Sequence, residues 1–191
     1  MSLDSSAVLS IFRHSGALLE GHFKLSSGLH STGYLQCALV LQHPPQAETL
    51  GRALADELRR LDATVVLSPA MGGLIIGHEV GRALGVRAIF SERQEGKMVL
   101  RRGFALSPAD RVVVIEDVVT TGLSTKETIA VVAGTGAAVA GAGAIIDRSG
   151  GTADLGVPFR ALVQLALPTY QPEACPLCAA GQPVTKPGSR V

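Results

Sequence analysis

The stretch Arg111-Val-Val-Val-Ile-Glu-Asp-Val-Val-Thr-Thr-Gly-Leu-Ser-Thr125 decides the fold class of this 191-residue chain. Residues 112–116 begin with four consecutive apolar residues and have no polar alternation, which predicts a strand buried on both faces. Two adjacent acids, Glu116 and Asp117, close the run, and a short hydroxylated loop leads to a helix predicted to begin near residues 124 and 125. A buried strand followed by a helix is typical of a parallel sheet covered by helices.

The same alternation continues on both sides of this stretch. It predicts an α/β fold with a mostly parallel sheet flanked by helices, in a single domain over residues 1–191. Further strands are expected at 64–68, 86–90 and 138–146, and helices at 3–20, 46–61, 74–84 and 125–133. Residues 23–36 predict a hairpin that turns near Ser27 and Gly28. The proline-rich tail, residues 168–191, is expected to be irregular.

Composition limits the partners of the chain. It has 17 basic and 16 acidic residues, a net charge of +1, so no overall basic field attracts nucleic acid. A phosphate-bearing ligand must therefore be bound locally. The uncharged run 128–146 is interrupted by four glycines, which argues against a membrane span. No secretory signal pattern opens the sequence, so we expect a cytoplasmic protein.

The end of the 112–116 strand carries chemistry suited to a sugar phosphate. Backbone N–H groups and hydroxyls at a helix N-terminus bind phosphate. Carboxylates beside it accept hydrogen bonds from sugar hydroxyls, or face a cation or Mg²⁺. Together these features describe a ribose 5-phosphate site. The alternative is an acid pair followed by an ordinary capped helix; a Walker loop and a dinucleotide fingerprint are both excluded by the sequence.

Three further segments have both a functional and a structural interpretation. Ser68-Pro-Ala-Met-Gly-Gly73 lets an anion approach the main chain, or is a Pro-Gly turn without a ligand. The polar loop 90–104 has four cations that could stabilise a departing polyanion, or form a solvated face: Arg93, Lys97, Arg101 and Arg102. Arg148, after the predicted strand 138–146, could bind a substrate carboxylate or pair with Asp147.

The run from Val112 to Thr125 resembles the phosphoribosyl pyrophosphate (PRPP) signature of type I phosphoribosyltransferases. The resemblance implies that Glu116 and Asp117 hold the ribose 2- and 3-hydroxyls, and that Mg²⁺ is carried by the pyrophosphate, with no protein ligand. It implies that the 5-phosphate is held by the loop made of Val118, Val119, Thr120, Thr121, Gly122, Leu123 and Ser124. It also implies that Ala70, Met71 and Gly72 bind the pyrophosphate. Such enzymes often have a non-proline cis peptide in this segment.

The hairpin Gly21-His-Phe-Lys-Leu-Ser-Ser-Gly-Leu-His-Ser-Thr-Gly-Tyr34 resembles the N-terminal hood of orotate phosphoribosyltransferases. The hood is expected over residues 1–45. This resemblance implies a homodimer that makes orotidine 5′-monophosphate and pyrophosphate from orotate and PRPP. It assigns orotate to Ser26, Tyr34, Thr120 and Arg148. The alternatives are a purine phosphoribosyltransferase and a non-catalytic regulator that senses PRPP or a nucleotide.

The loop 90–104 departs from the family pattern. Aligning Arg93 with the family's loop arginine places Lys97 on the second loop lysine, whereas Gln94 and Val99 replace a lysine and a histidine. The resemblance therefore implies that Arg93 and Lys97 bind PRPP and that Lys97 is catalytic. Arg101 or Arg102 could compensate for the missing groups.

The pair Cys175 and Cys178 is half of a zinc site. No second C-x-x-C follows, and His22, His30 and Cys37 are no more than possible ligands to complete it. On sequence alone a pair of free thiols is favoured over a metal site, and a disulfide is disfavoured in a reducing cytoplasm.

Overall fold

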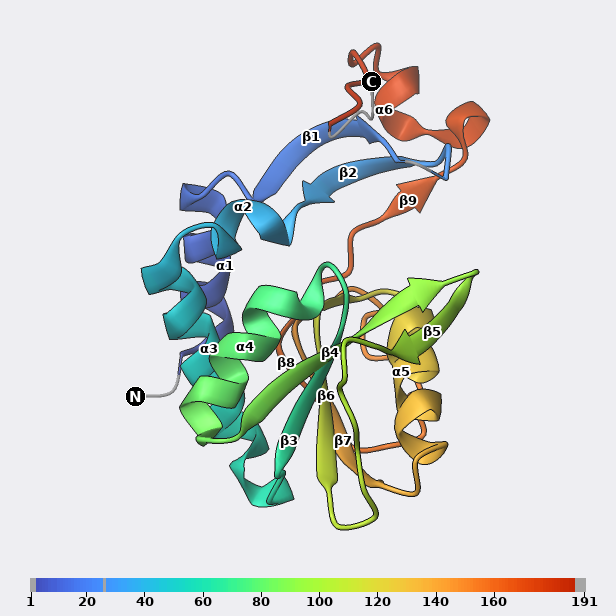
Figure 1. The fold of residues 1–191 in the computed structure, drawn as a ribbon. Helices are drawn as coiled ribbons and strands as arrows, with labels where there is room; N and C mark the ends of the chain where they lie inside the picture. The colour runs from blue at the N-terminus through green and yellow to red at the C-terminus, as the bar shows by residue number, and fades with distance from the viewer. Residues whose placement is uncertain (1–2, 26, 188–191) are drawn as a thin grey trace.

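The computed structural model describes residues 3–25 and 27–187, which form an α/β body beneath a small hood (Figure 1). The body contains a six-stranded sheet in the order β5-β4-β3-β6-β7-β8. All neighbours pair in parallel except β4 and β5. Its strands are β3 (Val65–Pro69), β4 (Arg87–Gln94), β5 (Lys97–Leu100), β6 (Arg111–Val119), β7 (Ala138–Asp147) and β8 (Phe159–Gln164). The predicted fold class is confirmed.

Helices cover both faces of this sheet, because its central strands are apolar on both sides. Val66 and Val113 pack towards one face, whereas Val65 and Val112 pack towards the other. The first face is covered by α1 (Ser5–His14), α2 (Cys37–Leu41), α3 (Pro44–Leu58) and α4 (Gly73–Leu84), and the second by α5 (Leu123–Ala133). A single 3-10 turn, η1 (Arg59–Leu61), links α3 to β3. None of the helices described is long and apolar enough to cross a membrane.

The hood has its own three-stranded sheet in the order β1-β2-β9. The hairpin of β1 (Leu18–Lys24) and β2 (His30–Leu35) is extended by β9 (Thr169–Tyr170) from the tail. The tail then forms η2 (Pro172–Ala174) and α6 (Pro176–Ala179) beside the hairpin, as Figure 1 shows. The prediction of an irregular tail is therefore wrong in part, since prolines at the first turns of η2 and α6 are compatible with helix.

The first helix is shorter than the predicted 3–20. It ends at His14 because Gly16 adopts a left-handed conformation with φ of 68°. The N–H of Ala17 donates to the carbonyl of Phe12 at 2.8 Å, and that of Gly16 donates to Arg13 at 3.1 Å. This is the Schellman pattern that terminates helices. The apolar residues after it belong to β1.

The predicted polar loop 90–104 is in fact largely the hairpin of β4 and β5. Gln94 pairs with Lys97 across a two-residue turn. Glu95 and Gly96 both have positive φ, 52° and 80°, as a tight hairpin turn requires. The strand β8 was also missed. The other predicted strands and helices are confirmed within a few residues, except that β6 continues to Val119 and so includes both acids.

Candidate functional site

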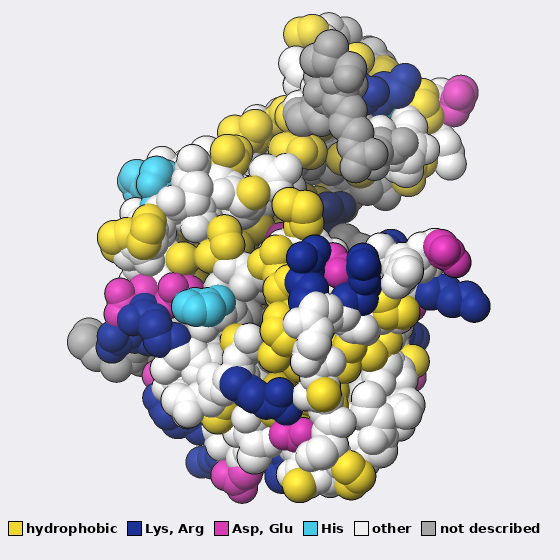
Figure 2. Space-filling model, in the orientation of Figure 1, with side chains coloured by type: hydrophobic (Ala, Val, Ile, Leu, Met, Phe, Trp, Pro, Cys, Tyr) yellow, Lys and Arg dark blue, Asp and Glu magenta, His cyan; other side chains and the backbone are white. Residues whose placement is uncertain are grey.

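Three loops of the body meet at one edge of the sheet. Because β3, β6 and β7 are parallel neighbours, the segments that follow them leave from the same side. These segments are residues 70–72, residues 120–122 and the loop that starts at Arg148; we call this the carboxyl edge. In Figure 1 the carboxyl edge faces the hood, and Figure 2 shows an open cleft between the two.

The acid pair lies at the end of β6. Glu116 is buried and Asp117 is half-buried, and the Asp117 carboxylate accepts a hydrogen bond from the Val118 N–H at 2.8 Å. Burial, and then the charge of Asp117, raise the pKa of Glu116 to about 9. Burial likewise raises the pKa of Asp117. Within the described residues no Lys or Arg forms an ion pair with either acid. A ligand with hydroxyl donors or positive charge at this site would therefore stabilise the ionised pair.

Cys37 is a neighbour of the acids that sequence reasoning did not assign to this site. It opens α2 and is almost fully buried. Burial, followed by the charges of Asp117 and Glu116, raises the pKa of its thiol well above the ordinary value. Cys37 and the acid pair are far apart in sequence and share no motif. Their proximity is visible only in the packing of α2 against the sheet.

The segment after β3 packs directly against Asp117. A Cβ atom added at Gly72 would lie 2.6 Å from the Asp117 Oδ1, and one at Gly73 would lie 2.8 Å from the Ile115 carbonyl. Glycines are therefore required for this close approach of the two loops. The Ala70–Met71 peptide is cis, as the family resemblance led us to expect. The structure thus brings the expected pyrophosphate segment and the acid pair together.

The segment after β6 presents unpaired donors. Gly122 has φ of 75°, and a Cβ there would lie 2.6 Å from the Leu155 Cδ2. The following helix, α5, begins at Leu123 without a side-chain cap on its Ncap residue, and the Leu123 N–H donates only a long bond, of 3.4 Å, to the Thr121 hydroxyl, so the first turn offers donors to a ligand. Thr120 and Thr121 beside them are exposed. These groups suit a phosphate monoester.

Arg148 follows β7 and does not pair with Asp147. The Asp147 carboxylate instead accepts from the Ser149 N–H at 2.8 Å, the Ser149 hydroxyl at 2.6 Å and the Gly151 N–H at 3.1 Å. The Arg148 Nε is buried without a hydrogen-bond partner, and burial lowers the pKa of this side chain. The salt-bridge interpretation is therefore wrong, and the guanidinium has an unused donor suited to an anion.

Three of the four cations in or just after the β4–β5 hairpin form ion pairs within the body. Arg93 pairs with Glu127 of α5 and donates to the Gly96 carbonyl at 2.8 Å. Arg101 and Arg102 lie 3.4 Å and 3.0 Å from the Glu92 carboxylate. Lys97, at the start of β5, is exposed. The ion pair of Arg93 with Glu127 of α5 differs from the expected contact with PRPP. The hairpin must therefore rearrange if Arg93 is to bind PRPP.

The hood contributes the remaining residues assigned to orotate. Tyr34 is half-buried, with its ring centroid 6.1 Å from that of Phe23. Ser26 lies outside the described residues. The cysteine pair of the tail is also at the hood, where it meets His22 and His30 but not Cys37.

Comparison with known proteins gives a consistent result. No family model matches the chain. The chain is 55% identical to orotate phosphoribosyltransferase from Heliobacterium modesticaldum, over 98% of the chain and 100% of that protein. It is 57% identical to the protein of that name from Erythrobacter litoralis, with 96% of each chain covered. The crystal structure of orotate phosphoribosyltransferase from Aeropyrum pernix superposes with a TM-score of 0.69 at 25% identity, covering 83% of this chain and 93% of that one.

Proposed function

The chain belongs to the orotate phosphoribosyltransferases, and from that premise we propose how its carboxyl edge performs their reaction. The enzyme transfers ribose 5-phosphate from PRPP to orotate, which gives orotidine 5′-monophosphate and pyrophosphate in pyrimidine biosynthesis. Its fold is that of the type I phosphoribosyltransferases. The relatives thereby favour orotate over the purine alternative.

PRPP is proposed to lie along the carboxyl edge. Its ribose 2- and 3-hydroxyls donate to Glu116 and Asp117, and its 5-phosphate accepts from the loop 118–124. Its pyrophosphate lies against residues 70–72. The observation that supports this proposal most is the close approach of Gly72 to Asp117, since it brings residues 70–72 next to the acid pair. The uncapped start of α5 supplies the phosphate donors.

Displacement at the anomeric carbon passes through a ribosyl cation-like state, which the ionised acids stabilise electrostatically. Lys97 and Arg93 are proposed to bind the departing pyrophosphate, with Arg101 or Arg102 in place of the missing loop groups. Arg93 must first leave Glu127. The exposed position of the hairpin tip is compatible with such a closing motion.

Mg²⁺ is proposed to enter with the pyrophosphate. The surroundings suit a hard cation carried by PRPP, because two carboxylates at this edge, without a paired Lys or Arg among the residues described, add negative charge nearby. When bound, Mg²⁺ neutralises charge on the leaving group. Glu116 and Asp117 are assigned to the ribose hydroxyls, so no protein side chain is assigned as a direct ligand of Mg²⁺.

Orotate is proposed to bind across the cleft from PRPP. The unused Nε of Arg148 points to recognition of the orotate carboxylate, to which a guanidinium binds with two parallel hydrogen bonds. Thr120 is proposed to orient the ring and Tyr34 to lie against it. Ser26 is assigned to the same ligand on the family resemblance.

We also propose a homodimer in which the β4–β5 hairpin of one subunit reaches the active site of the other.

A cytoplasmic location is supported by the three unpaired cysteines, since reducing conditions keep thiols free. The near-neutral charge of the chain gives no support for a nucleic-acid partner, and its partners are the two small substrates.

The test is the loss of orotate absorbance when PRPP and Mg²⁺ are added to the purified protein. Asp117→Asn is expected to lower kcat by more than about 100-fold while the thermal transition is retained. Exposed Asp56→Asn provides the matched control and should turn over normally. Wild-type rates in Asp117→Asn would remove this acid from the mechanism, and turnover of a purine in place of orotate would overturn the substrate assignment.

A further inference from the structure

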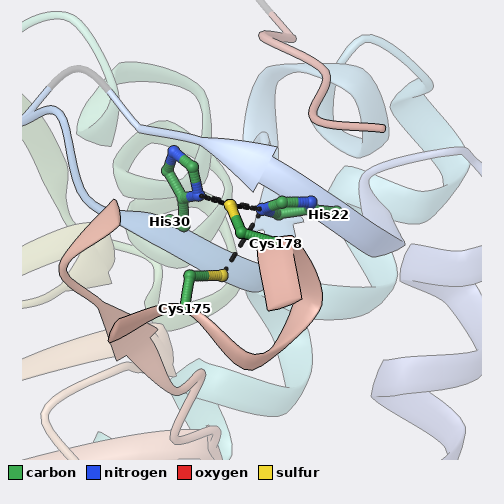
Figure 3. A group of neighbouring side chains, drawn as sticks. All are labelled: His22, His30, Cys175 and Cys178. Carbon is green, nitrogen blue, oxygen red and sulfur yellow. Dashed lines mark hydrogen bonds between the residues drawn. The ribbon is translucent and has the colours of Figure 1, made fainter. Parts of the chain in front are cut away.

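Four metal-ligating side chains converge between the hood hairpin and the tail, away from the carboxyl edge (Figure 3). His22 comes from β1, His30 from the start of β2, and Cys175 and Cys178 from the C-terminal α6 turn. One ligand atom from each lies within 4.8 Å of all the others. The sequence interpretation favoured free thiols because neither histidine is near the cysteines in sequence.

Three of the four short distances between ligand atoms match those of a tetrahedral zinc site, and the fourth, between the two imidazole nitrogens, is shorter by a few tenths of an ångström. Bonds of about 2.0–2.1 Å to nitrogen and about 2.3 Å to sulfur separate the ligand atoms of a tetrahedron by about 3.3–3.8 Å. The His22 Nε2 lies 2.9 Å from the His30 Nδ1, 3.5 Å from the Cys175 Sγ and 3.7 Å from the Cys178 Sγ. The Cys178 Sγ lies 3.3 Å from the His30 Nδ1. The donor atoms therefore surround a common centre.

Hydrogen bonding alone does not account for this convergence. The Nδ1 of His22 lies 2.9 Å from the Gln182 carbonyl, which can only accept, so the ring proton belongs on Nδ1. The Nε2 then carries no proton and presents a lone pair. Three other atoms able to ligate a metal, the His30 Nδ1 and the sulfurs of Cys175 and Cys178, nevertheless converge on it. A carbonyl bonded to the distal nitrogen is the outer-shell arrangement that fixes the tautomer of a metal-bound histidine.

We propose that His22, His30, Cys175 and Cys178 bind one structural Zn²⁺. The two thiols lose their protons to solvent on binding, and both imidazoles stay neutral, so Zn²⁺ with two thiolates gives an uncharged site. Such a site is compatible with relative exposures of 5% for each histidine and 2% for Cys175. Two sulfurs and two nitrogens in tetrahedral array select zinc over Mg²⁺ or Ca²⁺. All four positions are filled by protein, so the role is structural.

A zinc ion bound by these four residues would cross-link the tail to the hood hairpin. Otherwise the described tail beyond β8 is held to the hairpin by the two-residue strand β9, by an isolated bridge between Phe23 and Thr185, and by hydrogen bonds such as those to the carbonyls of Pro168 and Gln182. The Lys24 N–H donates to the Thr185 carbonyl at 2.8 Å, and the Thr185 N–H donates to the His22 carbonyl at 2.9 Å. A zinc ion joining residues of β1, β2 and α6 would fix the hairpin that carries Tyr34.

The direct test is the metal content of untagged protein purified without chelators. Elemental analysis is expected to give about one zinc per chain. A mercurial thiol reagent should release it, and Co²⁺ exchanged for it should show the visible absorption of a tetrahedral site with sulfur ligands. Metal-free protein whose cysteines react equally fast before and after chelation would overturn the proposal. So would protein with one reactive thiol after unfolding without reductant, because that result indicates a Cys175–Cys178 disulfide.

Substitutions locate the metal. Cys178→Ser and His22→Gln are expected to reduce zinc to less than about a tenth of the wild-type content. His43→Gln, an exposed histidine outside the cluster, and Cys37→Ser should keep it. If the ligand variants do not fold, chelation of the wild-type protein gives an independent reading: zinc loss should lower its Tm and speed proteolysis of the tail. Unchanged zinc in a folded Cys178→Ser protein would contradict the assignment.

Discussion

A side-chain carbon at Gly72 would lie 2.6 Å from Oδ1 of Asp117, so the segment after β3 and the acid at the end of β6 are in direct contact. Gly72 has φ of −56°, a conformation open to any residue. The absence of a side chain is therefore required by space alone. This contact joins two halves of the PRPP site that lie on different strands.

Gly72→Ala tests this contact. The added methyl group should displace Asp117 or the segment 70–72, and a misplacement of about 1 Å lowers kcat/KM by about 100-fold. Steady-state kinetics with PRPP measure the loss. Gly134→Ala is the control, since its Cβ would lie 3.5 Å from the nearest atoms, the carbonyl oxygens of Ala130 and Val131. Equal rates for both variants would show that the contact is not needed.

Glu116 should make stability depend on pH. Burial and the neighbouring Asp117 raise its pKa from 4.5 to about 9, so between these values the folded state keeps a proton that the unfolded state loses. The contribution of Glu116 to stability is therefore greatest at the acid end and falls as pH rises, by up to about 1.4 kcal/mol per pH unit. Thermal melts of the ligand-free protein should show a steeper fall for wild type than for Glu116→Gln. Exposed Glu57→Gln should retain the wild-type slope, and parallel profiles for all three would refute the prediction.

Arg148→Lys should weaken orotate binding selectively. The lysine keeps the charge but loses the planar pair of donors, so the KM for orotate should rise by about 10- to 100-fold while that for PRPP changes little. Arg160→Lys, at an exposed position on β8, is the matched control. An equal rise in both KM values would indicate a general structural role for Arg148.

Glu127→Gln should favour PRPP binding. The substitution removes the negative charge with which Arg93 pairs. An ion pair this exposed contributes at most about 1 kcal/mol, which corresponds to about a fivefold change in the KM for PRPP. The expected result is a lower KM for PRPP at low salt, with the advantage over wild type shrinking as salt screens the Arg93–Glu127 pair in the wild-type protein. Glu173→Gln, on the exposed tail, should have no effect. A higher KM would show that Glu127 supports the active arrangement of the hairpin.

The strand-and-helix body was predictable because its determinants are local. Residues 112–115 are four consecutive apolar residues, and a strand that is buried on both faces needs only that pattern. The errors arose where local signals competed. The apolar spacing of residues 17–19 continues the helical pattern, but the left-handed Gly16 ends the helix before them. The polar residues 93–98 gave no strand alternation, whereas the turn at Glu95 and Gly96 permits a hairpin.

The sequence by itself determined the chemistry available to this protein: an acid pair beside a phosphate loop, a cation after β7 and a C-x-x-C pair in the tail. Each is a short contiguous pattern whose meaning depends on its own side chains and backbone angles. Tertiary structure alone decided which patterns meet. It placed Gly72 against Asp117, left the Arg148 Nε without a partner, and brought His22 and His30 to Cys175 and Cys178. These contacts depend on parallel strand order and on the path of the tail, which are set by packing of the whole chain and have no local signature.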